Sequence, residues 1–230
     1  MTEKEKKEEE AIKVILVGDS GVGKTSLITC TQKKESFIEG AQISTMVCSF
    51  IKITLTISDI KYTINLWDTI GQEQFRSLTK IFLNNSKIVI FVFDITDKIS
   101  FDGMDYWFDL IEKELGSDII RGICANKQDL IDEQAIDDEK IEEYAKNKGV
   151  DFTFTSSLAP EGFNVFLEKL VEDYIKKYKP EMLINKGKNN KKITIDKNKK
   201  QKKKEKLLLN FFFIFEVIII YYSYISYHIF

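Results

Sequence analysis

Residues 12–25 read IKVILVGDSGVGKT, a mostly apolar run followed at once by a glycine-rich octapeptide. The octapeptide fits the pattern G-x-x-x-x-G-K-[ST], in which glycines let backbone N–H groups converge on phosphate oxygens. A buried strand before the pattern and a helix after it support this interpretation, and the sequence predicts both. We therefore expect a nucleoside triphosphate pocket in which Lys24 reaches the outer phosphates and the Thr25 hydroxyl ligates Mg²⁺.

Apolar runs of strand type alternate with helical stretches along the chain. Predicted strands cover residues 12–17, 47–57, 62–67, 88–94, 119–125 and 151–155, and predicted helices cover residues 24–31, 101–115, 138–147 and 162–178. This alternation predicts an α/β fold with a doubly wound, mostly parallel six-stranded sheet flanked by helices. The short connection at residues 58–61 predicts one antiparallel hairpin.

The charged side chains are unevenly distributed, although the net charge is only −2. Residues 1–178 carry 22 basic and 32 acidic side chains, whereas residues 179–206 carry 12 and 3. We expect a charged, disordered N-terminus at residues 1–10, one domain at 11–178 and a disordered Lys/Asn-rich linker at 179–206. An acidic domain gives no reason to expect nucleic acid binding, whereas the basic linker is suited to an anionic membrane surface.

The cysteines and the single histidine exclude several classes of chemistry. Cys30, Cys48 and Cys124 have neither the spacing of a zinc site nor that of a disulfide framework. His228 lies far along the chain from the phosphate motif, so histidine-dependent nucleophilic or acid–base chemistry is not expected. With no predicted signal peptide, these features favour a cytoplasmic protein.

Residues 207–230 form an apolar tail, LLLNFFFIFEVIIIYYSYISYHIF. As a helix this tail would span about 36 Å, more than a bilayer core of about 30 Å. Burying Glu216 is costly, but the apolar residues offset it at about −0.3 to −0.6 kcal/mol each. Two interpretations stay open: a membrane anchor, or a tail that is translated non-coding sequence or a truncated prenylation terminus. The terminus lacks the cysteine that prenylation needs.

Two further motifs follow predicted strands. In WDTIGQE, residues 67–73, Asp68 could hold Mg²⁺, the Gly71 N–H could approach a terminal phosphate and Gln72 could orient an attacking water. In ANKQD, residues 125–129, the Asp129 carboxylate can accept both hydrogen bonds that guanine donates, a pair that adenine lacks. Asn126 can tie loops together, and the stem of Lys127 can cover the base. Asp129 therefore disfavours an ATP-dependent P-loop enzyme.

The motifs GDSGVGKT, WDTIGQE, ANKQD and TSS, the last at residues 155–157, occur in the order and spacing of small GTPases. Over about residues 11–178 the chain resembles the Ras superfamily, and the Rab branch most closely, through Asp19-Ser20, QFRS at 74–77 and FDIT at 93–96. The resemblance implies the P-loop small GTPase fold, binding of GTP and GDP with Mg²⁺, and slow GTP hydrolysis. It also implies an exchange factor, an activating protein and effectors, in vesicle trafficking on the cytosolic face of an endomembrane.

The resemblance further implies the site residues. The nucleotide contacts carried over are Ser20, Gly21, Val22, Gly23, Lys24, Thr25, Ser26, Phe37, Thr45, Gly71, Asn126, Lys127, Asp129, Ser156, Ser157 and Leu158. Thr25, Thr45 and Asp68 correspond to the Mg²⁺ side, Thr45 only in the GTP state, and Gln72 corresponds to the catalytic residue. Phe37 corresponds to the ring that flanks the base.

Several positions depart from the family pattern. Ile70 stands where the family has alanine, Val47 and Ser49 replace a glycine and an aspartate, and Leu158 replaces a lysine. These departures support an alternative function, a hydrolysis-impaired GTP-binding module that acts as a fixed partner platform. No arginine is evident that could act in cis, so hydrolysis is expected to be slow until a partner supplies one.

Overall fold

The computed structural model describes residues 11–33, 49–69 and 76–180. These residues build one six-stranded sheet with the order β2-β3-β1-β4-β5-β6. The strands are β1 (Ile12–Val17), β2 (Ser49–Ile57), β3 (Ile60–Asp68), β4 (Ile88–Asp94), β5 (Ile120–Asn126) and β6 (Asp151–Phe154). Only β2 runs antiparallel to its neighbour, so the predicted α/β fold with a mostly parallel six-stranded sheet is confirmed.

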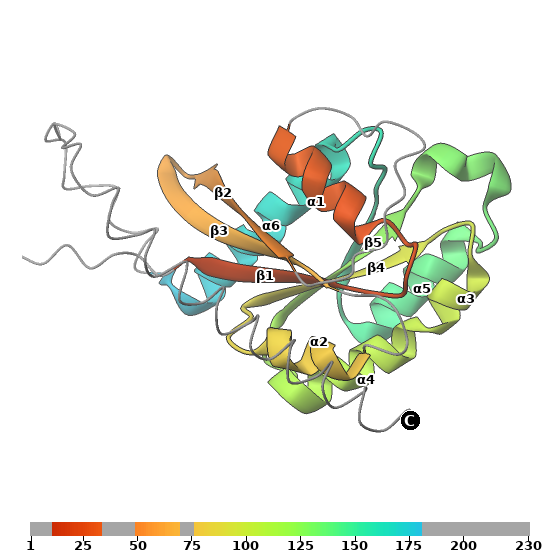
Figure 1. Ribbon diagram of the computed structural model, residues 1–230, viewed down its shortest axis with the longest axis horizontal. Helices are drawn as coiled ribbons and strands as arrows, with labels where there is room; N and C mark the ends of the chain where they lie inside the picture. The colour runs from red at the N-terminus through yellow and green to blue at the C-terminus, as the bar shows by residue number, and fades with distance from the viewer. Residues whose placement is uncertain (1–10, 34–48, 70–75, 181–230) are drawn as a thin grey trace, which may run out of the picture. The chain divides into compact units, whose positions relative to one another are not determined.

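Helices cover both faces of the sheet, as Figure 1 shows. The helices are α1 (Lys24–Lys33), α2 (Arg76–Leu83), α3 (Lys98–Asp102), α4 (Met104–Leu115), α5 (Asp138–Lys148) and α6 (Glu161–Tyr178), with a 3₁₀ helix, η2 (Gln128–Glu133). Helices α1 and α6 pack on one face, and α2, α3, α4 and α5 pack on the other. This two-sided cover explains the nearly continuous apolar strands, because both faces of each central strand are buried.

Strand β1 shows how the two cores share one strand. Val14 and Leu16 point toward the α1 and α6 side, whereas Ile15 and Val17 point toward α2, α4 and α5. All four side chains have no solvent exposure. Burial of each such side chain contributes about 1.5–3 kcal/mol, which holds the carboxyl end of β1 firmly in place.

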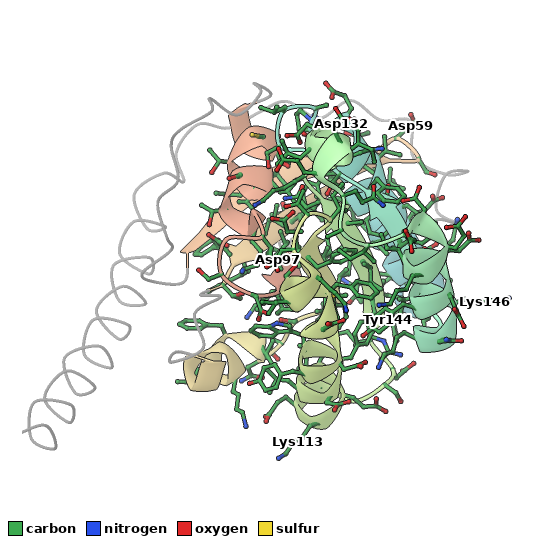
Figure 2. The ribbon with its side chains drawn as sticks, turned by 90° about the vertical axis from the view of Figure 1, so that its right-hand side faces the viewer. Asp59, Asp97, Lys113, Asp132, Tyr144 and Lys146 are labelled. Carbon is green, nitrogen blue, oxygen red and sulfur yellow. The ribbon has the colours of Figure 1, made fainter. Side chains whose placement is uncertain are left out.

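The predicted hairpin between β2 and β3 is confirmed, and its turn is tighter than the predicted connection. Ile57 pairs with Ile60, which leaves Ser58 and Asp59 as the two turn residues. Their φ angles are 53° and 64°, as a type I′ turn requires at both central positions. Asp59 is labelled at this turn in Figure 2.

The helix predicted over residues 101–115 is wrong as a single element. Gly103 separates α3 from α4, and the Asp97 side chain accepts a hydrogen bond from the Ile99 N–H at the start of α3. The Asp97 cap thus begins a separate short helix, before residue 101, where the apolar pattern predicts the helix to begin.

Helix α5 is joined to α4 by a hydrogen bond. Tyr144 of α5 donates its hydroxyl hydrogen to Asp105 of α4 at 2.9 Å, and Tyr144 lies between the two helices in Figure 2.

No helix in residues 11–33, 49–69 or 76–180 has both the length and the apolar character needed to cross a membrane. The predicted N-terminal segment 1–10 and the apolar tail 207–230 lie outside these ranges, as does the linker from residue 181 onward.

Gly122 offers a test of how closely α6 packs on β5. A β-carbon at Gly122 would lie 2.7 Å from Phe166 Cζ and 2.9 Å from Leu170 Cδ1. We expect Gly122→Ala to lower the free energy of unfolding by about 1–3 kcal/mol through overpacking, measured by urea denaturation. Combined with Phe166→Leu, which makes room, it should cost less than the sum of the two single changes. Additive effects would contradict the steric explanation.

Candidate functional site

The phosphate motif follows β1 at the carboxyl end of the sheet. The neighbours of β1 are β3 on one side and β4 on the other, so the strand order reverses direction at this point. In open α/β sheets, ligands bind in the crevice beyond the strand ends at such a switch point. The fold therefore places residues 18–25 where a ligand site is expected.

Two of the three glycines in this loop, Gly18 and Gly23, leave no space for a side chain. A β-carbon at Gly18 would lie 2.1 Å from the Val92 carbonyl oxygen, and one at Gly23 would lie 2.4 Å from Asn126 Nδ2. Their φ angles, 148° and 95°, are also values that side chains disfavour. The loop backbone therefore lies directly against β4 and Asn126, and these contacts define its path.

Lys24 begins α1 and is buried, with its ammonium turned back onto the loop. Lys24 Nζ donates hydrogen bonds to the carbonyl oxygens of Gly18 and Asp19, each at 2.7 Å. Burial lowers the pKa of Lys24 to about 8, although the negative charges of Asp68 and Asp19 oppose this shift. A desolvated ammonium at the beginning of a helix is a strong attractor for a phosphate.

Thr25 and Asp68 come together from different elements. Thr25 Oγ1 donates to Asp68 Oδ2 at 2.6 Å, and Asp68, the last residue of β3, is buried. The next residue, Thr69, donates its hydroxyl hydrogen to the Leu16 carbonyl oxygen at 2.7 Å, which ties the end of β3 to β1. Hydroxyl and carboxylate oxygens are the hard donors that Mg²⁺ prefers, so this pair fits a Mg²⁺ ion.

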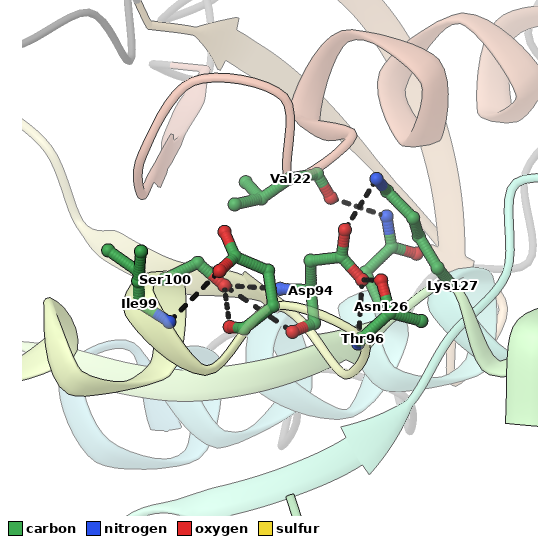
Figure 3. Close-up of polar contacts among 8 residues, drawn as sticks. Val22, Asp94, Thr96, Ile99, Ser100, Asn126 and Lys127 are labelled. Carbon is green, nitrogen blue, oxygen red and sulfur yellow. Dashed lines mark hydrogen bonds and ion pairs between the residues drawn. The ribbon is translucent and has the colours of Figure 1, made fainter. Parts of the chain in front are cut away.

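Asn126 joins three segments beneath the loop. Its Nδ2 donates to the Val22 carbonyl oxygen at 2.8 Å (Figure 3). Its Oδ1 accepts a hydrogen bond from Thr155 Oγ1 at 3.0 Å. Asn126 has a solvent exposure of only 1%. The last residue of β5 is therefore linked to the phosphate loop on one side and to the segment after β6 on the other.

The predicted guanine motif and the segment after β6 are in direct contact. Ser156 Oγ donates to Asp129 Oδ1, and it accepts a hydrogen bond from the Leu158 N–H at 3.0 Å. The Gln128 N–H also donates to the Thr155 carbonyl oxygen at 3.0 Å. These contacts fix the position of the Asp129 carboxylate relative to the backbone of residues 155–158.

Lys127 is held by a carboxylate that the sequence analysis did not assign to the site. Its Nζ lies 2.5 Å from Asp94 Oδ2, and Asp94 Oδ1 accepts hydrogen bonds from the Thr96 N–H and Oγ1 at 2.9 and 2.8 Å (Figure 3). Lys127 has a left-handed backbone, with φ 66°. The signal in the sequence was the position of Asp94, a single acidic residue ending an otherwise apolar strand.

The other predicted site residues divide into those that the structure describes and those that it does not. Among the described ones, Ser20 and Leu158 are exposed. Gly21 lies in the phosphate loop, Ser26 lies in α1, and Ser157 follows β6. Phe37, Thr45, Gly71 and Gln72 lie outside the described residues, as does Ile70. The structure thus brings together the phosphate loop, Asp68 and the guanine motif.

Comparisons with known proteins place these features in a family. The model of the Ras family matches residues 13–176. The chain is 38% identical to the Ras-related protein Rab-26 of Bos taurus and to that of Homo sapiens, over 157 residues, which are 68% of this chain and 60% of each Rab-26 protein. It is 36% identical to the human Ras-related protein Rab-37 over 155 residues, 67% of this chain and 68% of that protein. The chain thus spans 60% of the length of these Rab-26 relatives.

The pKa of Lys24 predicts a pH dependence for the binding of a phosphate ligand at this loop, with GDP as the probe. A phosphate bound beside Lys24 would stabilise the ammonium, so the pKa of Lys24 should be higher in the complex than the value of about 8 in the free site. Binding then takes up a proton above pH 8, and affinity should fall by up to about tenfold per pH unit as pH rises further. Calorimetric titration from pH 7 to 9.5 measures this decline.

Lys24→Met is the control for that titration, because it removes the titrating group with little change in shape. It should bind GDP more weakly and should lack the part of the decline that Lys24 causes. Any titration of the base affects both proteins equally. Parallel pH profiles for the two proteins would show that Lys24 is not responsible.

Proposed function

The chain belongs to the Ras family of small GTPases, and we propose that it is a GTP-binding switch in vesicle trafficking that hydrolyses GTP slowly. One observation carries this proposal. The buried Asn126 side chain joins the phosphate loop to the guanine motif through hydrogen bonds to Val22 and Thr155. A single ligand that spans both ends, with a guanine base and a chain of phosphates, fits this arrangement.

The base is recognised by Asp129. A carboxylate accepts two hydrogen bonds from guanine, at N1–H and the exocyclic amine, whereas adenine has an acceptor at N1. The Ser156 hydroxyl supports Asp129 at Oδ1 and orients the carboxylate before the ligand arrives. The ion pair with Asp94 holds the ammonium of Lys127 to one side, so that its aliphatic stem can lie along the base.

The phosphates are bound by Lys24 and the backbone N–H groups of residues 20–26. Thr25 and Asp68 would hold Mg²⁺, with Thr45 as a further ligand in the GTP state. The ion neutralises charge on the outer phosphate oxygens when it is bound. Gly71 and Gln72 complete the proposed site, with Gln72 orienting the attacking water and Phe37 flanking the base.

The small number of arginines supports slow hydrolysis in the absence of a partner. The chain has two, Arg76 and Arg121. Arg121 lies near the amino-terminal end of β5, whereas the site lies beyond the carboxyl ends of the strands, and Arg76 begins α2. An arginine in the active site contributes about 10³- to 10⁵-fold to the rate, so a partner that supplies one would control turnover.

Three aromatic side chains pack together on elements that follow or precede, in the sequence, the two switch segments that the family resemblance implies. Phe50 is 42% exposed, and its ring stacks on Trp67 with centroids 4.8 Å apart. Trp67 in turn contacts Phe82, at 6.3 Å between centroids. An exposed aromatic side chain stacked on half-buried ones is typical of protein interfaces, and we propose that effectors bind here. The basic linker would hold the protein near the anionic cytosolic face of an endomembrane.

GTP turnover tests the proposed function directly. The purified full-length chain, kept in mild detergent, should retain GDP in the presence of Mg²⁺ and release phosphate from GTP over hours. Phosphate release is measured against buffer and against Gln72→Leu, which should be slower because it cannot orient water. Absence of release above buffer would leave the fixed platform as the supported function.

Ile70→Ala distinguishes the two functions further. If the bulky Ile70 side chain impairs the switch, alanine should accelerate GDP exchange or GTP hydrolysis. Equal rates in the two proteins would remove the main support for the fixed platform.

Base selectivity should depend on Asp129. Asp129→Asn removes the charged acceptor, and charge-assisted hydrogen bonds contribute about 1.5–3 kcal/mol each, so GDP affinity should fall about 10²-fold. Asp132→Asn is the matched control, because Asp132 is an exposed carboxylate of the same 3₁₀ helix (Figure 2). Competition between GDP and ADP measures the preference. A full preference for GDP in Asp129→Asn would rule out this role for the carboxylate.

A further inference from the structure

The carboxylate of Asp19, within the phosphate loop, is held by a helix far along the chain. Trp107 Nε1 donates a hydrogen bond to Asp19 Oδ1 at 3.0 Å, across 88 residues of sequence. Trp107 belongs to α4 and has no solvent exposure. The other carboxylate oxygen lies close to Gly103, where a β-carbon would be only 2.7 Å from Asp19 Oδ2. Both oxygens therefore lie on the α3 and α4 side of the loop.

The backbone of the same residue faces Lys24. The Asp19 carbonyl oxygen accepts a hydrogen bond from Lys24 Nζ at 2.7 Å. Asp19 thus presents its carbonyl to the phosphate-binding lysine and its carboxylate to α4. This separation matters because a carboxylate turned toward the phosphates would repel them and would compete with them for Lys24.

We propose that Trp107 is a positioning residue for the phosphate loop, which holds the Asp19 carboxylate away from the phosphates and thereby slows nucleotide release. The proposal rests on the nucleotide binding proposed above. An indole N–H suits this task because it can only donate, and because the ring is fixed in the core. Trp107 therefore holds the loop from the α4 side, and its effect on nucleotide release is exerted on the side of the loop that faces Lys24.

Gly103 supports the same interpretation independently. Its φ of −71° and ψ of −10° are values that any residue adopts, so its backbone conformation does not require glycine. The missing side chain instead provides the space that Asp19 Oδ2 occupies. The junction of α3 and α4 is thus shaped around the carboxylate.

The test measures GDP dissociation from the full-length chain in Mg²⁺, by chasing a fluorescent GDP analogue with excess GDP. Trp107→Phe removes the N–H, and the loss of a hydrogen bond to a charged group should accelerate release about 10- to 100-fold. Phe108→Leu is the matched control. Phe108 is a buried aromatic residue of the same helix, stacked on Phe91, and its loss weakens the core without touching the loop.

Two further variants separate positioning from packing. Gly103→Ala should also accelerate release, because the methyl group displaces the carboxylate while Trp107 is intact. In an Asp19→Ala background, Trp107→Phe should have no further effect on release, since no carboxylate remains to be held. A mere packing role for Trp107 would leave its effect unchanged in that background.

The outcomes are distinct. Faster release in Trp107→Phe and Gly103→Ala, abolished by Asp19→Ala, supports the proposal. Release at the wild-type rate in both variants overturns it while nucleotide binding stands. If Trp107→Phe does not fold, Gly103→Ala with and without Asp19→Ala decides the question. A wild-type chain that retains no GDP would instead overturn the proposed function, and the inference with it.

Discussion

The buried amide of Asn126 is the contact on which the rest of the site depends. A buried side-chain amide is costly unless both its donor and its acceptor are paired, and Asn126 pairs them with the Val22 carbonyl and the Thr155 hydroxyl. Gly23 lies so close to this amide that no side chain fits between them. The relative positions of the phosphate loop and the guanine motif therefore follow from one residue at the end of β5.

Each carboxylate near the phosphate loop, at the carboxyl end of the sheet, has a specific partner. The domain is acidic, yet the carboxylates nearest the loop each have a cationic or hydrogen-bonding group beside them. Asp68 accepts from Thr25, Asp94 pairs with Lys127 and Asp19 accepts from Trp107. Lys24 remains oriented toward backbone carbonyls. An anionic ligand can then approach a buried ammonium whose hydrogen-bond partners are backbone carbonyls.

The sequence predicted the strands and the hairpin well because each is a local pattern. Buried parallel strands are continuous apolar runs, and the two-residue turn at Ser58 and Asp59 directly joins the antiparallel strands β2 and β3. The sequence predicted no helix at α2, because its eight residues give only about two turns of periodicity. It also predicted one helix where the structure has α3 and α4. That division depends on Gly103, whose requirement for glycine arises from Asp19, a residue distant in the chain.

The sequence by itself determined the family, the order of the motifs and the chemical identity of the groups proposed to contact phosphate, base and metal, because these are encoded in short contiguous segments. Only the tertiary structure decided which side chains meet across long separations. The ion pair of Asp94 with Lys127 and the hydrogen bond of Trp107 to Asp19 depend on how helices and strand ends pack beside the loop. Packing over a shared core brings such residues together, and no local pattern records the distance between them.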